Sequence, residues 1–174
     1  IFLANLTGYW KLGSADNQAV SASLRYFSLG EVTSRDYQGA VMTSINPFEM
    51  AVDLGYSRKL SESYSMGVVL RYIYSDLGFS DGSADDETKG ASAFAADISG
   101  YYTSYPIVGR NECQWSLGWN ISNIGSKVGY SGGNNPAFLP TNLRVGTAFT
   151  FPLADYRNLT LSADLNKLLV PARP

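Results

Sequence analysis

The sequence predicts an all-β protein, an antiparallel transmembrane β-barrel, on two observations. First, large apolar side chains occupy every second position in segments of about ten residues, a length typical of outer-membrane strands, and this pattern recurs eight times. Small or polar side chains lie between them, which is the period of a strand with two unlike faces. Second, the connections alternate between short and long, as short periplasmic turns and longer extracellular loops do.

The first four strands follow from this alternation and from the turns between them. A polar turn at residues 13–17 ends the first strand, a longer loop at 30–46 follows the second, and a short turn at 59–63 follows the third. The fourth strand has the clearest pattern, because its large residues from Tyr64 to Tyr74 alternate with mostly small or polar ones. The expected strands are residues 2–12, 18–29, 48–57 and 64–75.

The remaining four strands are bounded by turn-forming and acidic residues. A long loop at 78–91 precedes the fifth strand, and a link at 103–113, which contains Pro106, precedes the sixth. A Gly/Asn/Pro loop at 125–140 precedes the seventh strand, and a short turn at 152–158 precedes the last. The expected strands are residues 94–102, 114–122, 142–151 and 159–166. The three long loops are expected outside the cell and the four shorter connections in the periplasm.

Composition agrees with this fold and excludes several classes of function. The 174 residues include 12 Tyr, 8 Phe, 3 Trp and 17 Gly, and the net charge is −2, so no basic surface points to nucleic acid. A soluble β-sandwich could share this composition, but a sandwich has no reason to sort its loops by length. Histidine is absent, which removes Ser-His-Asp and Cys-His catalysis and histidine metal sites. We therefore expect no enzyme and no cofactor, and we expect the single Cys113 to be an unpaired, incidental thiol.

Residues 1–174 are expected to form a segment of a single outer-membrane β-barrel domain. Eight strands suffice to close a small barrel. However, the chain opens within a strand, and its last residues lack the terminal aromatic residue of many bacterial barrels. We therefore favour a segment of a larger barrel over a closed eight-stranded one.

The polar face of the predicted strands carries both cations and carboxylates. A cation facing lipid at the bilayer centre costs about 2–4 kcal/mol, so these side chains are expected to face the lumen, where opposite charges on neighbouring strands can pair. Two interpretations stay open: a hydrogen-bonded network that rigidifies the barrel, or a polar path for solutes. The residues of this predicted lumen network are Arg25, Asp53, Arg71, Asp97, Arg144 and Asp164.

Six runs of the sequence resemble the PorV family, also called LptO, of the Bacteroidetes type IX secretion system. The resemblance covers essentially the whole chain, and these runs are far more specific than the strand pattern alone. They extend from Gly8 to Leu12, Ser21 to Val32, Tyr56 to Ser61, Asn120 to Ser126, Pro140 to Arg144 and Asp164 to Pro171.

The resemblance implies a FadL-like barrel of about fourteen strands, of which this chain would supply about eight, and a non-enzymatic role. Proteins of this family act as outer-membrane shuttles. They bind the C-terminal signal domain of cargo that leaves the large translocon barrel, and they pass it to a PorU-like sortase that attaches it to lipopolysaccharide. The expected partners are therefore outer-membrane lipid and lipopolysaccharide, the translocon barrel, the sortase and the cargo domains. Candidate extracellular-loop contacts are Tyr37, Asp85, Asp86, Glu87, Tyr130, Asn134 and Phe138.

Two other functions compete with the shuttle. A FadL-like transporter of hydrophobic solutes is the alternative, because small residues on the polar face leave room inside the barrel. An outer-membrane hydrolase ranks last, because without histidine it needs an Asp/Asp or Ser/Lys pair that the sequence does not offer. The acidic run from Asp81 to Glu87 does not have the spacing of an EF-hand, so a solvated loop is expected there rather than a calcium site.

Overall fold

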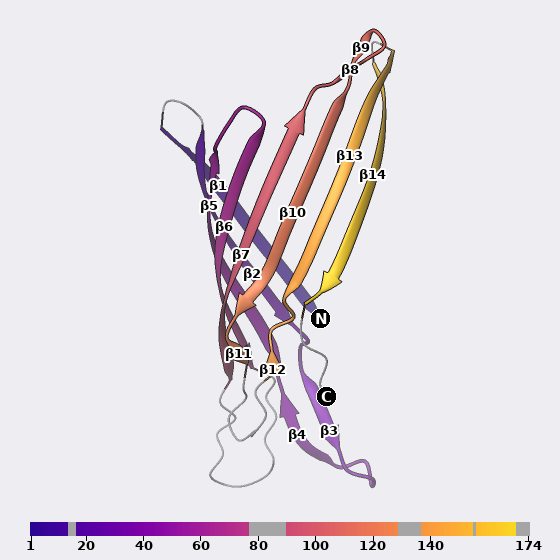
Figure 1. Cartoon of the computed structure of the whole chain (residues 1–174). Coiled ribbons are helices and arrows are strands. Elements are labelled where there is room, and N and C mark those ends of the chain that lie inside the picture. Colours follow the sequence, from indigo (N-terminus) through magenta and orange to yellow (C-terminus); the bar gives the residue numbers. More distant parts are fainter. Residues whose placement is uncertain (14–16, 77–89, 129–136, 155, 170–174) are drawn as a thin grey trace.

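A curved and twisted sheet of eight antiparallel strands dominates the protein (Figure 1). The computed structural model describes residues 1–13, 17–76, 90–128, 137–154 and 156–169, and none of these residues is helical. Each strand of the main sheet pairs with the next long strand along the chain, in the order β1-β2-β5-β6-β7-β10-β13-β14. Their bounds are β1 Phe2–Leu12, β2 Gln18–Ser28, β5 Phe48–Lys59, β6 Tyr64–Asp76, β7 Ala91–Ser104, β10 Gln114–Gly125, β13 Asn142–Ala154 and β14 Arg157–Leu168.

The predicted fold class and all eight predicted strands are confirmed, with each strand paired antiparallel to its sequence neighbour. The sheet is not closed. Within the described residues, β1 pairs only with β2 and β14 only with β13. The sheet is therefore consistent with a fragment of a β-barrel.

Three small hairpins lie in connections that the sequence predicted only as loops or links. They are β3 (Val32–Arg35) with β4 (Val41–Ile45), β8 (Ile107–Val108) with β9 (Asn111–Glu112), and β11 (Lys127–Val128) with β12 (Ala137–Phe138). Strands of two to five residues are too short to show a readable alternation, so the pattern that located the long strands could not locate these.

Six of the eight strands extend beyond their predicted bounds, and β7 and β13 show the reasons most clearly. β7 begins at Ala91 rather than at residue 94, because Ala91 and Ala93 continue the pairing with Ser75 and Ile73. Their small side chains gave no alternating signal. β13 continues through Pro152 to Ala154, where a register shift interrupts its pairing with β14. A proline fits at such an irregularity because it has no amide proton to donate.

The antiparallel order places the connections at two opposite ends of the sheet. The connections β2–β5, β6–β7 and β10–β13 lie at one end, which we call the loop end, and the four shorter ones lie at the other, the turn end. Figure 1 shows the β3–β4 and β11–β12 hairpins together at the loop end and the β8–β9 hairpin at the turn end. The alternation of loop lengths along the sequence thus becomes a difference between two ends of the molecule.

The two faces of the sheet differ in chemistry and in exposure. On the apolar face, large side chains stand free, and Leu70 in mid-strand is 67% exposed. The opposite face, which carries Asp53 and Asp97, is here called the inner face. Side chains on the inner face are buried in the middle strands, where Ala93 is 2% and Asp97 is 9% exposed. An apolar belt open to the surroundings and a polar inner face are the pattern of a membrane barrel wall.

Aromatic side chains gather near both ends of the apolar face. Near the loop end they form a row across four strands, and near the turn end they form two pairs. Ring centroids in these groups lie 4.5–6.3 Å apart. Aromatic girdles at both interfaces are a further feature of barrels in membranes. The row is Phe2, Tyr26, Phe48 and Tyr74, and the pairs are Tyr102 with Trp115 and Phe149 with Phe151.

Candidate functional site

A cluster of charged side chains lies on the inner face where β2, β5 and β6 run side by side. The strand register places Asp53 directly opposite Ser23 on one neighbour and Arg71 on the other. The Asp53 carboxylate accepts hydrogen bonds from Arg71 Nε at 2.7 Å, from Arg25 Nη2 at 2.8 Å and from Ser23 Oγ at 3.0 Å. Three strands are therefore tied together through one carboxylate.

Arg71 extends this cluster to β7 and β10. Its Nη2 lies 3.0 Å from Asp97 Oδ2 on β7, and its Nη1 donates to Asn123 Oδ1 on β10 at 2.7 Å. The Arg71 side chain is only 15% exposed. Arg71 thus sits between Asp53 and Asp97, and the planar fork of the guanidinium matches the two carboxylates.

Asn123 reaches the inner face because of a β-bulge. Pairing between β10 and β7 shifts between Ile121 and Ile124, so that Ser122 and Asn123 together face Asp97. Asn123 has a φ of 58°, a left-handed conformation that asparagine adopts more readily than most residues. The extra residue reverses the alternation of β10, and a side chain that would otherwise point outward turns inward.

Asn123 also joins the cluster to the loop end. Its backbone amide donates to Asp97 Oδ1 at 2.8 Å, and its side-chain Nδ2 donates to the Pro140 carbonyl at 3.3 Å. The Asn123 carbonyl accepts from Thr141 Oγ1 at 3.0 Å. Hydrogen bonds therefore run continuously from Arg25 on β2 to the segment that leads into β13.

Four of the six residues of the predicted lumen network lie together, and two lie apart. Arg25, Asp53, Arg71 and Asp97 belong to the cluster described above. Arg144 and Asp164 are exposed, and within the described part of the chain neither forms an ion pair. Their register explains the separation, since Arg144 faces Asn166 and Asp164 faces Gly146. The prediction that all six residues line a lumen stays a prediction.

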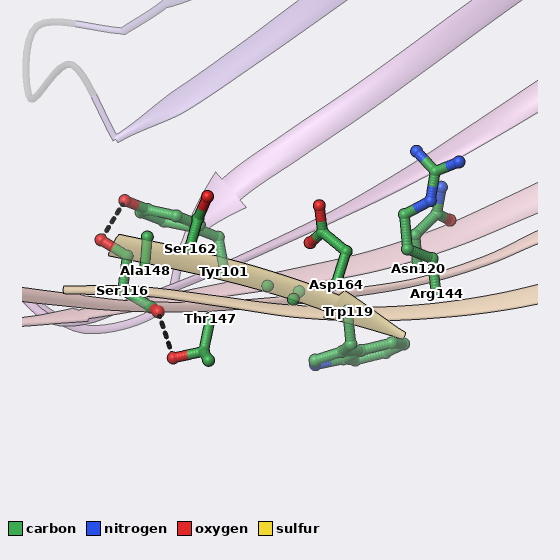
Figure 2. A pocket seen from close by; sticks show the side chains of 12 residues that line it. Tyr101, Ser116, Trp119, Asn120, Arg144, Thr147, Ala148, Ser162 and Asp164 are labelled. Atoms are coloured by element: carbon green, nitrogen blue, oxygen red, sulfur yellow. Dashed lines mark hydrogen bonds between the residues drawn. The ribbon is translucent and has the colours of Figure 1, made fainter. Parts of the chain in front are cut away.

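Arg144 and Asp164 instead border an open cavity of about 310 Å³ on the inner face of β7, β10, β13 and β14. Figure 2 shows their side chains on the same side of the strands as Tyr101, Ser116 and Ser162, whereas Trp119 and Thr147 point to the other side. The hydroxyls of Tyr101 and Ser116 lie 2.9 Å apart. The space above Gly118 is open, whereas the Asp164 carboxylate covers Gly146.

The predicted loop contacts are described only in part. Asp85, Asp86, Glu87, Tyr130 and Asn134 lie outside the described residues. Phe138 lies in β12 at the loop end, where Lys127 Nζ stands 4.5 Å from the centre of its ring.

Tyr37, the remaining predicted contact, occupies the tip of the β3–β4 hairpin and is 96% exposed. The tip is well ordered by its own hydrogen bonds. Asp36 Oδ1 accepts from the backbone amides of Gln38 at 2.8 Å and Ala40 at 2.9 Å. Gly39 supplies the positive φ of 85° that the turn requires. The tyrosine is therefore presented on a preformed turn.

Sequence reasoning missed Asn123. The strand pattern was followed only to residue 122, and the bulge lies immediately beyond it. A signal was present: large apolar residues stand at Ile121 and Ile124 rather than at every second position. A break of this kind in an otherwise regular strand marks an inserted residue.

Neither metal-binding clusters nor long apolar helices are found in the described ranges. No group of three or more His, Cys, Asp or Glu residues among them is arranged to hold a metal ion. No helix there has the length and apolarity needed to cross a membrane.

Comparison with known proteins gives one family. No significant match to the chain was found among curated proteins. The family model for the type IX secretion system protein PorV matches residues 1–174, the whole chain. The six runs of sequence and the antiparallel eight-stranded sheet agree with that match. The chain therefore belongs to the PorV family of type IX secretion system components.

Proposed function

We propose that the protein is an outer-membrane shuttle of the type IX secretion system. In this role it binds the C-terminal signal domain of secreted cargo and passes it from the large translocon barrel to a PorU-like sortase at the cell surface. The family match supports the secretion system. The observation that carries the binding role is the β3–β4 hairpin, which presents Tyr37 at the loop end.

The chemistry of the hairpin suits a protein partner. Tyrosine offers a large contact area with few rotatable bonds, and such residues are frequent anchors of protein interfaces. The hydrogen bonds of Asp36 fix the turn before any partner arrives, so that little conformational freedom is lost on binding. Val32 at the base of the hairpin and Val41 near its tip are also exposed, and they add apolar surface to the hairpin.

The exposed apolar face supports a location in the outer membrane, with the loop end outside. Leucines from several strands stand on this face, and lipid is the solvent that favours them. Lipopolysaccharide and the other barrels of the secretion system are then the neighbours of this wall. The protein has no need of an active site in this role.

The proposal is tested by co-purification of the full-length protein with the C-terminal domain of a type IX cargo. Tyr37→Ala is expected to reduce the cargo recovered, because it removes the anchor at the hairpin tip. Tyr156→Ala is the matched control, since Tyr156 is 99% exposed at the opposite, turn end. Equal recovery with the two variants, or no cargo with the wild-type protein, would contradict the proposal.

A transporter of hydrophobic solutes is the second candidate, and the cavity of about 310 Å³ is the observation in its favour. Arg144, Asp164 and several hydroxyl-bearing side chains border this cavity, and an apolar solute leaves such groups unpaired. The wall therefore favours the shuttle over the transporter. Uptake of a fatty acid that is lost on blocking the cavity with Gly146→Trp would reverse this preference.

A further inference from the structure

Asn123 combines two properties that no other described residue of the chain shares. It is the one non-glycine residue with a positive φ in the described part of the structure, and it forms hydrogen bonds in two directions. Toward the inner face it contacts Arg71 and Asp97, and toward the loop end it contacts Pro140 and Thr141. Asparagine adopts a left-handed backbone more readily than most residues, and these four bonds fix Asn123 in that conformation.

The start of the β10–β13 connection is held by a separate set of hydrogen bonds. Ser126 N donates to the Phe94 carbonyl at 2.9 Å, and the Phe94 amide donates to Ser126 Oγ at 3.1 Å. Gly125 is required there, because a Cβ at this position would overlap the Phe94 carbonyl. The chain leaving β10 is thus held against β7, while the chain entering β13 is joined to the inner face through Asn123.

The segment entering β13 has other attachments, but none of them reaches the charged cluster. Leu139 and Thr141 share a local hydrogen bond, the Leu169 amide donates to the Thr141 carbonyl at 2.8 Å, and Phe138 pairs with Lys127 in the β11–β12 hairpin. The bonds from Asn123 to Pro140 and Thr141 are the ones that join residues 138–141 to the charged cluster. These bonds therefore join two of the six runs that resemble the PorV family, Asn120 to Ser126 and Pro140 to Arg144.

We propose that Asn123 is a positioning residue, which holds residues 138–141 against the charged cluster of the inner face and so sets how this short segment is presented to cargo. The cargo part rests on the proposed function, whereas the positioning part does not. The bulge gives Asn123 its role, because the side chain at this position would point outward in a regular strand and could not reach the cluster.

The positioning part is tested by hydrogen exchange on the full-length protein in lipid nanodiscs. Asn123→Gly keeps the left-handed backbone at no steric cost but removes both side-chain hydrogen bonds. Loss of the bond to Pro140 is expected to speed exchange of the amides in residues 138–142 by about tenfold, the range set by one to two hydrogen bonds. Amides of β6 between residues 65 and 70 serve as the internal reference and are expected to exchange as before.

Thr141 gives a second pair of variants that leaves Asn123 untouched. Thr141→Val removes the bond to the Asn123 carbonyl, and Thr141→Ser restores the hydroxyl. Faster exchange of residues 138–142 in the valine variant and wild-type exchange in the serine variant support the proposal. Unchanged exchange in both Asn123→Gly and Thr141→Val overturns it.

Affinity for the cargo C-terminal domain separates positioning from a purely structural role. Thr141→Val is expected to weaken binding several-fold at unchanged thermal stability of the barrel, while Thr141→Ser binds as the wild type. Asn123→Gly is expected to weaken binding as well, and also to lower stability, because Arg71 loses its hydrogen bond to the asparagine side chain. Faster exchange with unchanged affinity overturns the link to cargo. If the wild-type protein binds no cargo domain, the proposed function fails, and the exchange rates alone still decide whether Asn123 positions the segment.

Discussion

Arg71 Nε donates a hydrogen bond to Asp53 Oδ1 at 2.7 Å across the β5–β6 pair, and the same guanidinium contacts Asp97 on β7. One cation thus contacts two carboxylates whose side chains are each 12% exposed. Removing it leaves both carboxylates without their central partner in a poorly solvated place. The stability of the sheet therefore depends on this arginine far more than on a surface arginine.

Arg71→Met is expected to lower the free energy of unfolding by about 3–5 kcal/mol, the usual cost of removing one partner from a buried ion pair. Urea unfolding of the full-length protein in lipid vesicles measures the loss. Arg25→Met is the matched control, because Arg25 contacts the same Asp53 but is 47% exposed. The Arg25→Met variant is expected to lose about 1 kcal/mol of unfolding free energy or less. Equal losses in the two variants would show that burial of the pair is not what matters.

Gly100→Ala is expected to destabilise the protein by about 1–3 kcal/mol through overpacking. The indole of Trp119 covers Gly100, and a Cβ there would overlap the ring and come within 2.8 Å of the Tyr64 hydroxyl. Such covering of a glycine by an aromatic ring supports a strand position that lacks a side chain. Urea unfolding gives the stability, and a change in tryptophan fluorescence reports displacement of the indole.

Gly118→Ala is the control for this substitution. A Cβ at Gly118 meets only Tyr101 Cδ2, at 4.0 Å, which is an ordinary contact distance. Its stability is expected to stay within about 0.5 kcal/mol of the wild type. If Gly118→Ala is as harmful as Gly100→Ala, the cost comes from the strand backbone and not from the tryptophan.

Asp36→Ala is expected to loosen the β3–β4 hairpin and to weaken cargo binding by about fivefold, roughly the effect of losing one hydrogen bond. The carboxylate of Asp36 accepts from two backbone amides in the turn below Tyr37. Asp36→Asn keeps the accepting oxygen and is expected to bind as the wild type. Calorimetric titration with the cargo domain compares the two, and similar behaviour of the alanine and asparagine variants would rule out a role for the preformed turn.

The long strands were predictable because each has one clear periodic face and a turn on either side. In the run from Tyr64 to Tyr74 every second residue is large and apolar, and this run forms most of β6. The β3–β4 hairpin was not predictable in the same way, since its strands have four and five residues and its stability comes from a turn built on Asp36. Alternation of large and small residues distinguishes the two faces of a long strand, but strands of four or five residues are too short to show it.

The charged cluster was predictable in its members and only partly in its contacts. Alternation assigns a charge to a face, and Asp53 and Arg71 then meet because the register sets them opposite each other. Arg144 and Asp164 share the face as well, but the register sets Asp164 opposite Gly146. The spacing of Ile121 and Ile124 signals a bulge, but the hydrogen bonds of Asn123 are made to residues distant in sequence, and no local pattern contains them.

The two faces of β1 are expected to meet different surroundings, with lipid against the apolar face only. Leu6 and Thr7 are neighbours near the middle of this strand and point to opposite faces, with Thr7 opposite Ser23 of the inner face. Leu6→Arg is expected to cost about 2–4 kcal/mol of folding free energy in lipid vesicles, the penalty for a cation on the lipid side at the bilayer midplane. Thr7→Arg keeps the same cation on the inner face, within the same strand, and is expected to fold in vesicles with little loss. Reversible urea titration in vesicles measures both variants side by side. Equal penalties would mean that the apolar face does not meet lipid, and the assignment of inner and outer faces would have to be abandoned.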